Sequence, residues 1–165
     1  MNDGAGVLVT THGQDWLCAW HPPPDPPAGT PHGAAGICFA DGKVVLVSRD
    51  GEAWTIPGGR PERGETGLDT LRREVREEAC ATVVGHTLLG YTRGACVRGR
   101  QEGTRLVRSP WRAEVRLGDW APTHEMGHRK LVTPAEALRA VVAAEPDMGP
   151  IYRRAFREAV VLHDS

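Results

Sequence analysis

Three glutamates, Glu74, Glu77 and Glu78, stand close together near the middle of the chain. On an α-helix, with about 100° between successive residues, their side chains fall on one arc roughly 100° wide. Neighbouring negative charges repel one another, and a hard divalent cation held by oxygen ligands, such as Mg²⁺, would relieve this repulsion. A solvated acidic helix face has the same pattern, so the three glutamates alone leave both interpretations open.

The surrounding residues predict a glycine-rich loop that leads into a helix. The loop runs from Gly58 to Glu65, and the helix is expected over about residues 66–80. Thr66 is placed to cap the helix, with Asp69 three residues later. An apolar stripe at helical spacing would pack the helix on a core; it consists of Leu68, Leu71, Val75 and Ala79.

The order and spacing of these residues resemble the Nudix box of the Nudix hydrolases, Gly-x5-Glu-x7-Arg-Glu-U-x-Glu-Glu-x-Gly-U, where U is a bulky aliphatic residue. A match of this length rarely arises by chance. Val75 fills the first aliphatic position, but Cys80 replaces the last glycine and Ala81 is a small residue at the last aliphatic position. The fixed positions that match are Gly59, Glu65, Arg73, Glu74, Glu77 and Glu78.

The resemblance implies metal-dependent hydrolysis of the diphosphate bond in a nucleoside diphosphate linked to another group. Nucleoside triphosphates, nucleotide sugars and dinucleotides are substrates of this type. Diphosphate oxygens are anionic and repel an attacking water, and a divalent metal removes that repulsion and activates the water. The expected cofactor is therefore Mg²⁺ or Mn²⁺, and the expected partner is a small nucleotide.

The resemblance also assigns roles to single residues. The metal ligands that it implies are the backbone carbonyl of Gly58 and the carboxylates of Glu74, Glu77 and Glu78. The catalytic residues that it implies are Arg73, Glu77, Glu78 and Glu125. Among these, Glu125 is the candidate general base, ahead of Glu102, although a solvated loop carboxylate is an equal alternative for Glu125.

Four further residues are expected to support the site or to bind the substrate. Gly59 and Glu65 would support it, with Glu65 either paired to Arg73 or placed at the edge of the metal cluster. Arg49 and Arg60 flank the loop and are candidates for contacts with phosphate.

Cys80 is the informative departure from the box. A glycine after a helix usually adopts the left-handed conformation, which cysteine resists. We therefore expect an altered helix exit here, with an end further along the chain as one possibility, and unaffected metal ligands.

Two other functions are compatible with the sequence. A Nudix-like nucleotide sensor would keep the fold without turnover. The run His124-Glu125-Met126-Gly127-His128 matches the His-Glu-x-x-His pattern of zinc peptidases, which requires a helix so that both histidines share one face. Pro122 and Gly127 disfavour a helix there, so the peptidase is the remote alternative.

Strands mixed with one early and two late helices predict an α+β or α/β sandwich. Their order resembles that of the Nudix fold, which implies an α+β fold, an α/β/α sandwich with a mixed sheet between helices. Residues 1–33 are expected to form an N-terminal extension, with a candidate β-hairpin and a proline-rich linker. Residues 34–165 would form the Nudix hydrolase domain. The arginine- and glycine-rich stretch 93–105 is expected to be a loop between strands at 82–91 and 106–117.

The net charge and the hydropathy of the chain indicate which kinds of binding partner are not expected. The net charge of −1 gives no long-range field that favours long nucleic acid. No apolar run approaches the roughly 20 residues of a membrane span, so we expect no membrane partner and a cytoplasmic location. The sequence leaves open whether the protein forms a homodimer. Residues 1–33 and 93–128 are expected to select the substrate.

Overall fold

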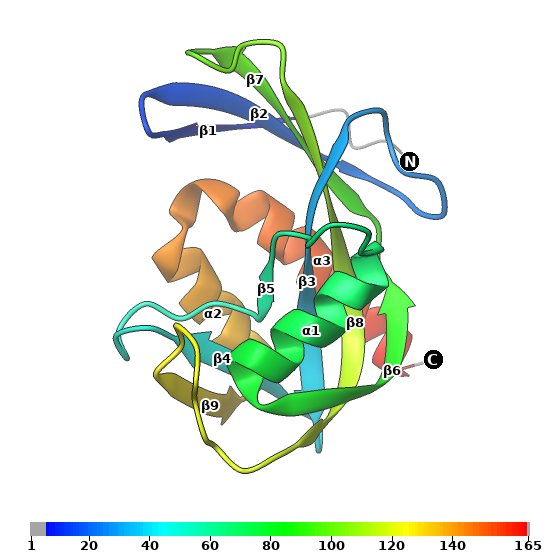
Figure 1. Cartoon of the computed structure of the whole chain (residues 1–165), viewed down its shortest axis with the longest axis vertical. Helices are drawn as coiled ribbons and strands as arrows, with labels where there is room; N and C mark the ends of the chain where they lie inside the picture. The colour runs from blue at the N-terminus through cyan, green and yellow to red at the C-terminus, as the bar shows by residue number, and fades with distance from the viewer. Residues whose placement is uncertain (1–5, 165) are drawn as a thin grey trace.

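The computed structural model describes residues 6–164, and the side chains of residues 6–161. A mixed sheet with the strand order β1-β2-β7-β8-β3-β4-β9 forms the middle of the molecule, and β5 and β6 pair beside it with β3 and β8 (Figure 1). The strands are β1 (Val7–Thr11), β2 (Gln14–His21), β3 (Thr30–Ala40), β4 (Lys43–Ser48), β5 (Gly58–Gly59), β6 (Ala81–Leu88), β7 (Tyr91–Arg98), β8 (Arg105–Leu117) and β9 (His128–Val132). The helices are α1 (Gly67–Ala79), α2 (Pro134–Ala144), the 3-10 turn η1 (Pro146–Met148) and α3 (Gly149–Asp164).

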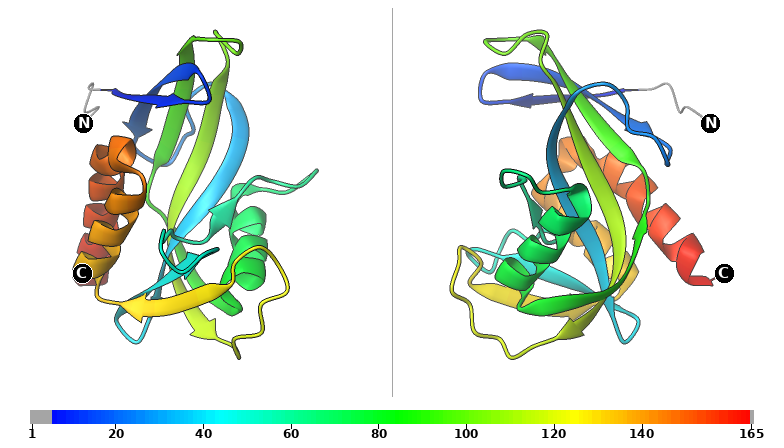
Figure 2. Two further views of the ribbon diagram at one scale, coloured as in Figure 1. Left: turned by 90° about the vertical axis from the view of Figure 1, so that its left-hand side faces the viewer. Right: turned by 45° about the vertical axis from the view of Figure 1, so that its right-hand side comes forward.

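Helices cover both faces of the sheet, which confirms the α+β sandwich predicted from the sequence. Figure 2 shows α1 on one side of β3 and β8 and the pair α2 and α3 on the other. Alternate residues of β3 serve the two layers, because successive side chains of a strand point to opposite faces. Ile37 packs in the core beneath α2 and α3, whereas Cys38 packs beneath α1 with Leu71 and Val75.

The loop before α1 is fixed by a short strand pairing. Ala34 and Ala35 of β3 pair antiparallel with Gly59 and Gly58 of β5. A Cβ atom at Gly59 would lie 2.7 Å from Cδ of Glu74, so only glycine lets the loop approach the acidic side of α1 so closely. This pairing holds the loop against the helix.

The N-terminal residues extend the sheet. β1 and β2 form a hairpin, and β2 pairs with β7 from Asp15 to His21. The proline-rich residues 22–29 follow without helix or strand, and β3 begins at Thr30. The division between residues 33 and 34 stays a prediction, and β3 runs across it.

The composition of residues 93–105 predicts a loop, but the structure shows that this stretch is not a single loop. Residues up to Arg98 belong to β7, which pairs with β2 on one side and with β8 on the other. Backbone pairing on both sides overrides the local preference of arginine and glycine for irregular structure. The turn is confined to residues 99–104.

The expectation of an altered helix exit at Cys80 is wrong. The helix ends at Ala79, and Cys80 adopts the left-handed conformation, with φ 51° and ψ 46°. Surrounding contacts hold it there, since Nη1 of Arg129 donates to the carbonyl oxygen of Ala79 at 2.8 Å and the backbone N–H of Gly118 donates to that of Cys80. The fold therefore imposes the glycine-like helix exit on a cysteine.

Replacing Cys80 with glycine is expected to stabilise the protein by about 1 kcal/mol, because the left-handed conformation costs a residue with a side chain about 1–2 kcal/mol and part of that gain is offset by the chain entropy of glycine. Urea unfolding of both proteins measures the difference. Equal stability, or a less stable Cys80→Gly protein, would show that the helix exit carries no such strain.

Candidate active site

Arg73 is the centre of a charged network on α1. Its Nε donates to Oε2 of Glu65 at 2.8 Å, and its Nη1 donates to Oε1 of Glu74 at 2.7 Å and to Oε2 of Glu77 at 3.2 Å. Its Nη2 donates to the carbonyl oxygen of Arg60 at 2.8 Å. One guanidinium group thus joins the loop to the helix and fixes the orientation of two of the glutamates.

Glu65 is held where the sequence suggested, paired with Arg73. Its Oε1 also accepts from the backbone N–H of Glu62 and from the hydroxyl of Thr70, which is fully buried. The hydrogen bond from Arg73, followed by that from Glu62, lowers the pKa of Glu65 to about 2. Thr70, which the sequence analysis did not single out, therefore helps to lock this carboxylate in place.

The box helix starts as the sequence predicted. The hydroxyl of Thr66 accepts from the backbone N–H of Asp69 at 3.1 Å, and the carboxylate of Asp69 accepts from the backbone N–H of Thr66 at 3.0 Å. This reciprocal capping box sets the first turn of α1. The positions of the glutamates further along the helix follow from that start.

Glu78 lies against the glycine loop and is only 9% exposed. Its Oε1 accepts from the backbone N–H of Gly58 at 2.8 Å. Burial, and then the negative charges of Glu74 and Glu125, raise the pKa of Glu78 to about 7. The pKa of Glu74 is also raised, above all by burial. Burial therefore disfavours the charged form of both carboxylates in the metal-free protein, although Arg73 pairs with Glu74.

The raised pKa of Glu78 gives a pH-dependent prediction for the metal-free protein. A carboxyl whose pKa is higher in the folded than in the unfolded state lowers the stability as the pH rises from about 4.5 towards 7. A metal-free Glu78→Gln protein should therefore unfold at a higher temperature than wild type above pH 7 and at a similar temperature near pH 4. Thermal unfolding in EDTA at both pH values measures this. The same loss of stability at both pH values would contradict it.

The donor set of this region suits a hard divalent cation. Glu74, Glu77 and Glu78 offer carboxylate oxygens, the ligands that Mg²⁺ and Mn²⁺ prefer. Arg73 engages one oxygen of Glu74 and one of Glu77, while Oε1 of Glu77 lies 3.8 Å from Nε2 of His124. Within residues 6–161, no three acidic, histidine or cysteine side chains are already gathered as a metal site. The glutamate side chains would therefore have to change orientation to share one ion.

Arg49 and Glu125 meet across two loops. Nη2 of Arg49 donates to Oε2 of Glu125, and both side chains are about two-thirds exposed, at 67% and 66%. Both are close enough to Glu78 to affect its pKa, Glu125 raising it and Arg49 lowering it. The loop of residues 118–127 is fixed on β4 by the N–H of Gly127, which donates to the carbonyl oxygen of Ser48. The structure thus brings both residues to the edge of the acidic cluster.

Glu102, the second choice for the general base, lies elsewhere. It occupies the turn between β7 and β8, where its backbone N–H donates to the carbonyl oxygen of Gly99. This turn is at the end of the two strands that projects away from α1 (Figure 1).

The His-Glu-x-x-His run does not form a zinc-binding helix. Residues 118–127 contain neither helix nor strand, and His128 begins β9. The ring of His128 packs edge-on against Trp54, with ring centroids 6.4 Å apart, whereas His124 lies near Thr123 and Glu77. The shared helix face that the peptidase mechanism requires is missing, which removes the support for this alternative.

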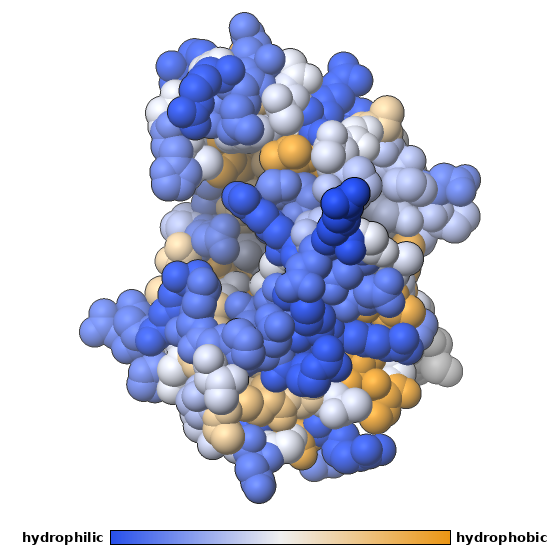
Figure 3. Space-filling model, in the orientation of Figure 1, coloured by the Kyte–Doolittle hydropathy of each residue, from blue (hydrophilic) through white to orange (hydrophobic). Residues whose placement is uncertain are grey.

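Two adjoining cavities lie beside the acidic cluster. The smaller, of about 220 Å³, reaches Gly58 and Glu78, and the larger, of about 510 Å³, opens under the N-terminal hairpin. Figure 3 shows a largely hydrophilic face that is hollowed between this hairpin and the rest of the molecule. Thr92, Arg108, Glu145 and Met148 line both cavities.

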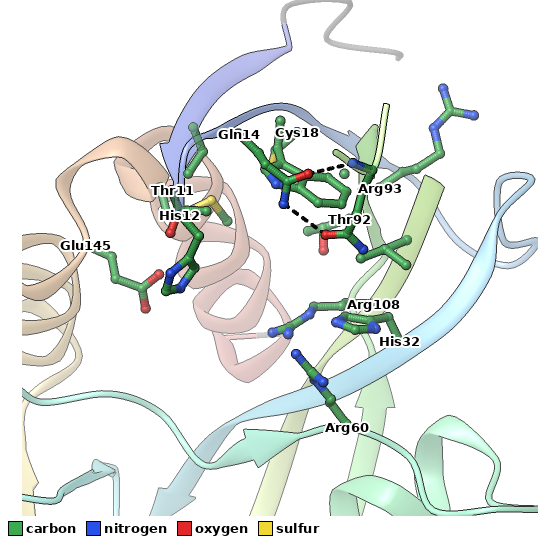
Figure 4. A pocket seen from close by; sticks show the side chains of 16 residues that line it. Thr11, His12, Gln14, Cys18, His32, Arg60, Thr92, Arg93, Arg108 and Glu145 are labelled. Atoms are coloured by element: carbon green, nitrogen blue, oxygen red, sulfur yellow. Dashed lines mark hydrogen bonds between the residues drawn. The ribbon is translucent and has the colours of Figure 1, made fainter. Parts of the chain in front are cut away.

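Arg60 points into the larger cavity, where it lies with two residues to which the sequence analysis gave no individual role. Figure 4 shows Arg60 beside His32 and Arg108 on one side of the cavity, across from His12 and Glu145. The sequence analysis placed Arg108 only within the residues 93–128 that are expected to select the substrate, and His32 within the N-terminal extension. The proximity of His32 to Arg108 follows only from the parallel pairing of β3 with β8, which places Gly33 opposite Arg108.

Comparison with known proteins identifies the family. A NUDIX domain model matches residues 30–155, so the chain belongs to the NUDIX domain family, as its box had suggested. Hydrolases of this family generally require a divalent cation.

Individual relatives are similar to parts of the chain or to its fold. An RNA pyrophosphohydrolase of Halorhodospira halophila (strain DSM 244 / SL1) is 44% identical over 61 residues, which cover 35% of this chain and 34% of the relative. The match thus spans about a third of that protein's length. A Bacillus subtilis pyrophosphohydrolase, BsRppH, superposes with a TM-score of 0.68 at 21% identity, covering 92% of this chain and 96% of the other. A NUDIX hydrolase from Nitrosomonas europaea gives a TM-score of 0.62 at 20% identity, covering 81% and 90%. These two likenesses concern the fold.

Proposed function

We propose that this protein hydrolyses the diphosphate bond of a nucleoside diphosphate linked to another group, with Mg²⁺ or Mn²⁺ as cofactor. The observation that carries the proposal is the acidic cluster of α1. Its carboxylates are fixed by Arg73 and by the N–H of Gly58, and the pKa values of Glu74 and Glu78 are raised by burial. A divalent cation would supply the missing positive charge, neutralise the diphosphate and activate a water.

The roles of the box residues follow from these contacts. Glu74, Glu77 and Glu78, together with the carbonyl of Gly58, are proposed to hold the cation. Arg73 positions Glu74 and Glu77, since it donates to both carboxylates. Gly59 and Glu65 keep the loop against the helix, through the close approach of Gly59 to Glu74 and the ion pair of Glu65 with Arg73.

Glu125 is proposed as the general base, and Arg49 as a contact for substrate phosphate. In the structure the two side chains form an ion pair at the edge of the acidic cluster. A phosphate group that bound Arg49 would compete with Glu125 for the guanidinium and would free the carboxylate to accept a proton from water. Binding of the substrate would thus prepare the base.

The 5′ end of an RNA is a second candidate substrate. Two observations favour it: the partial match to an RNA pyrophosphohydrolase and the 510 Å³ cavity, which leaves room beyond a single nucleotide. This candidate departs from the expectation that long nucleic acid is not a partner.

The cytoplasmic location stays a prediction from the sequence, and the sequence leaves open whether the protein forms a homodimer. Separately, no helix within residues 6–164 is long and apolar enough to span a membrane.

A substrate screen tests the proposal. The purified protein is incubated with Mg²⁺ or Mn²⁺ and nucleoside triphosphates, nucleotide sugars, dinucleoside polyphosphates or 5′-triphosphorylated RNA, and the release of phosphate, diphosphate and nucleoside monophosphate is measured. Metal-dependent cleavage of at least one substrate at the diphosphate is the expected result. Tight binding of a nucleotide without any turnover would contradict the hydrolase and favour the nucleotide sensor.

A further inference from the structure

Three basic side chains from distant parts of the chain converge in the larger cavity. His32 comes from β3, Arg60 from the loop between β5 and α1, and Arg108 from β8. All three line the cavity, and Figure 4 shows them side by side with their polar ends directed towards one another. Arg60 and Arg108 carry like charges, which repel each other.

The protein itself supplies these groups with little compensation. Within residues 6–161, no side chain forms a hydrogen bond or ion pair with the ring of His32 or the guanidinium groups of Arg60 and Arg108. The pKa of His32 is lowered by burial and then by Arg108 and Arg60. Arg108 is exposed to the opening of the cavity; its pKa is lowered by desolvation among the residues around it and then by Arg60, and Glu145 opposes this only in part. An anionic ligand would satisfy all three groups.

The cluster lies next to the acidic site and is separate from it. Arg108 lines both cavities, and the smaller cavity ends at Glu78 and the glycine loop. That smaller cavity has mainly apolar walls, which include Trp20, Ile56 and Ile151. An apolar volume of about 220 Å³ suits a sugar or base, with a charged group at each end.

The larger cavity continues beyond the cluster. It is walled by the N-terminal hairpin, which contributes Trp16 and Gln14, and the position of Gln14 is fixed by its hydrogen bond to Gln101 at 2.9 Å. The partly exposed ring of Trp16 is a surface on which a nucleobase can stack, whereas the amide of Gln14 is buried and bonded to Gln101 through both its nitrogen and its oxygen. The order along the hollow is therefore acidic cluster, apolar cavity, basic cluster and a second cavity.

We propose that His32, Arg60 and Arg108 form a second phosphate subsite, which binds a phosphate attached to the far side of the nucleoside whose diphosphate is cleaved. The inference rests on the proposed function, and it narrows the substrate to nucleotides that carry phosphate on both sides of one nucleoside. A 5′-triphosphorylated oligonucleotide has this chemistry, whereas a nucleoside triphosphate lacks the second group.

Equilibrium binding tests the subsite without turnover. Metal-free protein in EDTA is titrated calorimetrically with nucleoside 3′,5′-bisphosphates and with the matching 5′-monophosphates of each base. At least one bisphosphate should bind about tenfold more tightly or better than its monophosphate, since a charge-assisted contact is lost without the 3′ phosphate. Arg108→Ala should abolish this preference, and Arg108→Lys, which keeps the charge, should retain part of it.

Arg116→Ala is the matched control, because Arg116 is an exposed arginine of the same strand that does not line either cavity. It should keep the wild-type preference. Equal binding of bisphosphates and monophosphates, or the same preference in Arg108→Ala as in Arg116→Ala, would overturn the subsite. A larger effect of Arg108→Ala on nucleoside triphosphate binding than on bisphosphate binding would also overturn it, since the cluster would then hold the 5′ phosphates.

Kinetics separate this inference from the proposed function. Arg108→Ala should raise KM for a 5′-triphosphorylated dinucleotide about tenfold and change KM for the nucleoside triphosphate much less. A protein with Arg108-dependent bisphosphate binding but no turnover of any substrate would refute the hydrolase and leave the subsite standing. A protein that turns over both substrates with the same KM, unaffected by Arg108→Ala, would refute the subsite and leave the hydrolase standing.

Discussion

Replacing Glu77 with glutamine is expected to lower kcat about a thousandfold at saturating Mg²⁺, which corresponds to about 4 kcal/mol of lost transition-state stabilisation. Glutamine keeps the shape of the side chain but removes the charge that the proposed cation needs. The rate of product release from the best substrate of the screen measures the effect. The fold should be retained, because Arg73 still pairs with Glu65 and Glu74.

Glu52→Gln provides the control for this substitution. Glu52 is an exposed glutamate of the loop after β4. The substitution Glu52→Gln therefore removes the same charge at a position outside α1. Its kcat should equal that of wild type. If Glu77→Gln and Glu52→Gln are equally active, Glu77 has no role in catalysis and the assignment of the acidic cluster is wrong.

Replacing Arg73 with alanine is expected to have the largest effect on stability, a loss of about 2–4 kcal/mol. The side chain of Arg73 is 14% exposed, and those of its partners Glu65 and Glu74 are 16% and 13% exposed. Without the guanidinium, several half-buried carboxylates would repel each other and the loop would lose its link to the helix. Urea unfolding of the metal-free protein at neutral pH measures the loss.

Arg72→Ala is the matched control, because Arg72 is the exposed neighbour of Arg73 on the same helix. The Arg72→Ala substitution should lower the free energy of unfolding by less than about 0.5 kcal/mol.

A pH series adds a second test of the role of Arg73. The pKa of Glu65 is lowered in the folded protein, so its ion pair stabilises at neutral pH and this contribution is lost as the pH falls from 4.5 towards about 2. Arg73→Ala should show a weaker acid dependence; equal stability of the Arg72→Ala and Arg73→Ala proteins would contradict the account.

The acidic cluster could be predicted from the sequence because its geometry is local. Thr66, Arg73 and Glu77 lie within about three turns of one helix, and helical spacing alone decides which of their side chains are neighbours. The roles of Gly58 and Glu65, in the loop directly before that helix, were implied by the resemblance to the Nudix box and not by helical spacing.

The basic cluster could not be predicted in this way. His32, Arg60 and Arg108 meet only because β3 pairs with β5 on one side and, in parallel, with β8 on the other. Such pairings join residues far apart in the chain, and periodicity does not encode the register between strands. The arginine-rich composition also concealed β7, whose pairing with β2 places the N-terminal hairpin over the cavity.

Cys80 shows a different limit. Cysteine disfavours the left-handed conformation, but the local free-energy cost of that conformation is only about 1–2 kcal/mol. The contacts of Arg129 and Gly118 with the end of the helix are non-local, and they outweigh that cost. Local preferences therefore predicted the strain at this position and failed to predict the conformation.

Titration with Mn²⁺, followed by the electron paramagnetic resonance signal of the free ion, tests the central claim most directly, that Glu74, Glu77 and Glu78 hold a divalent cation. The wild-type protein should deplete the free signal, and Glu77→Gln should weaken the binding at least about tenfold, whereas Glu52→Gln should not. Identical Mn²⁺ binding by the wild-type and Glu77→Gln proteins would contradict the claim.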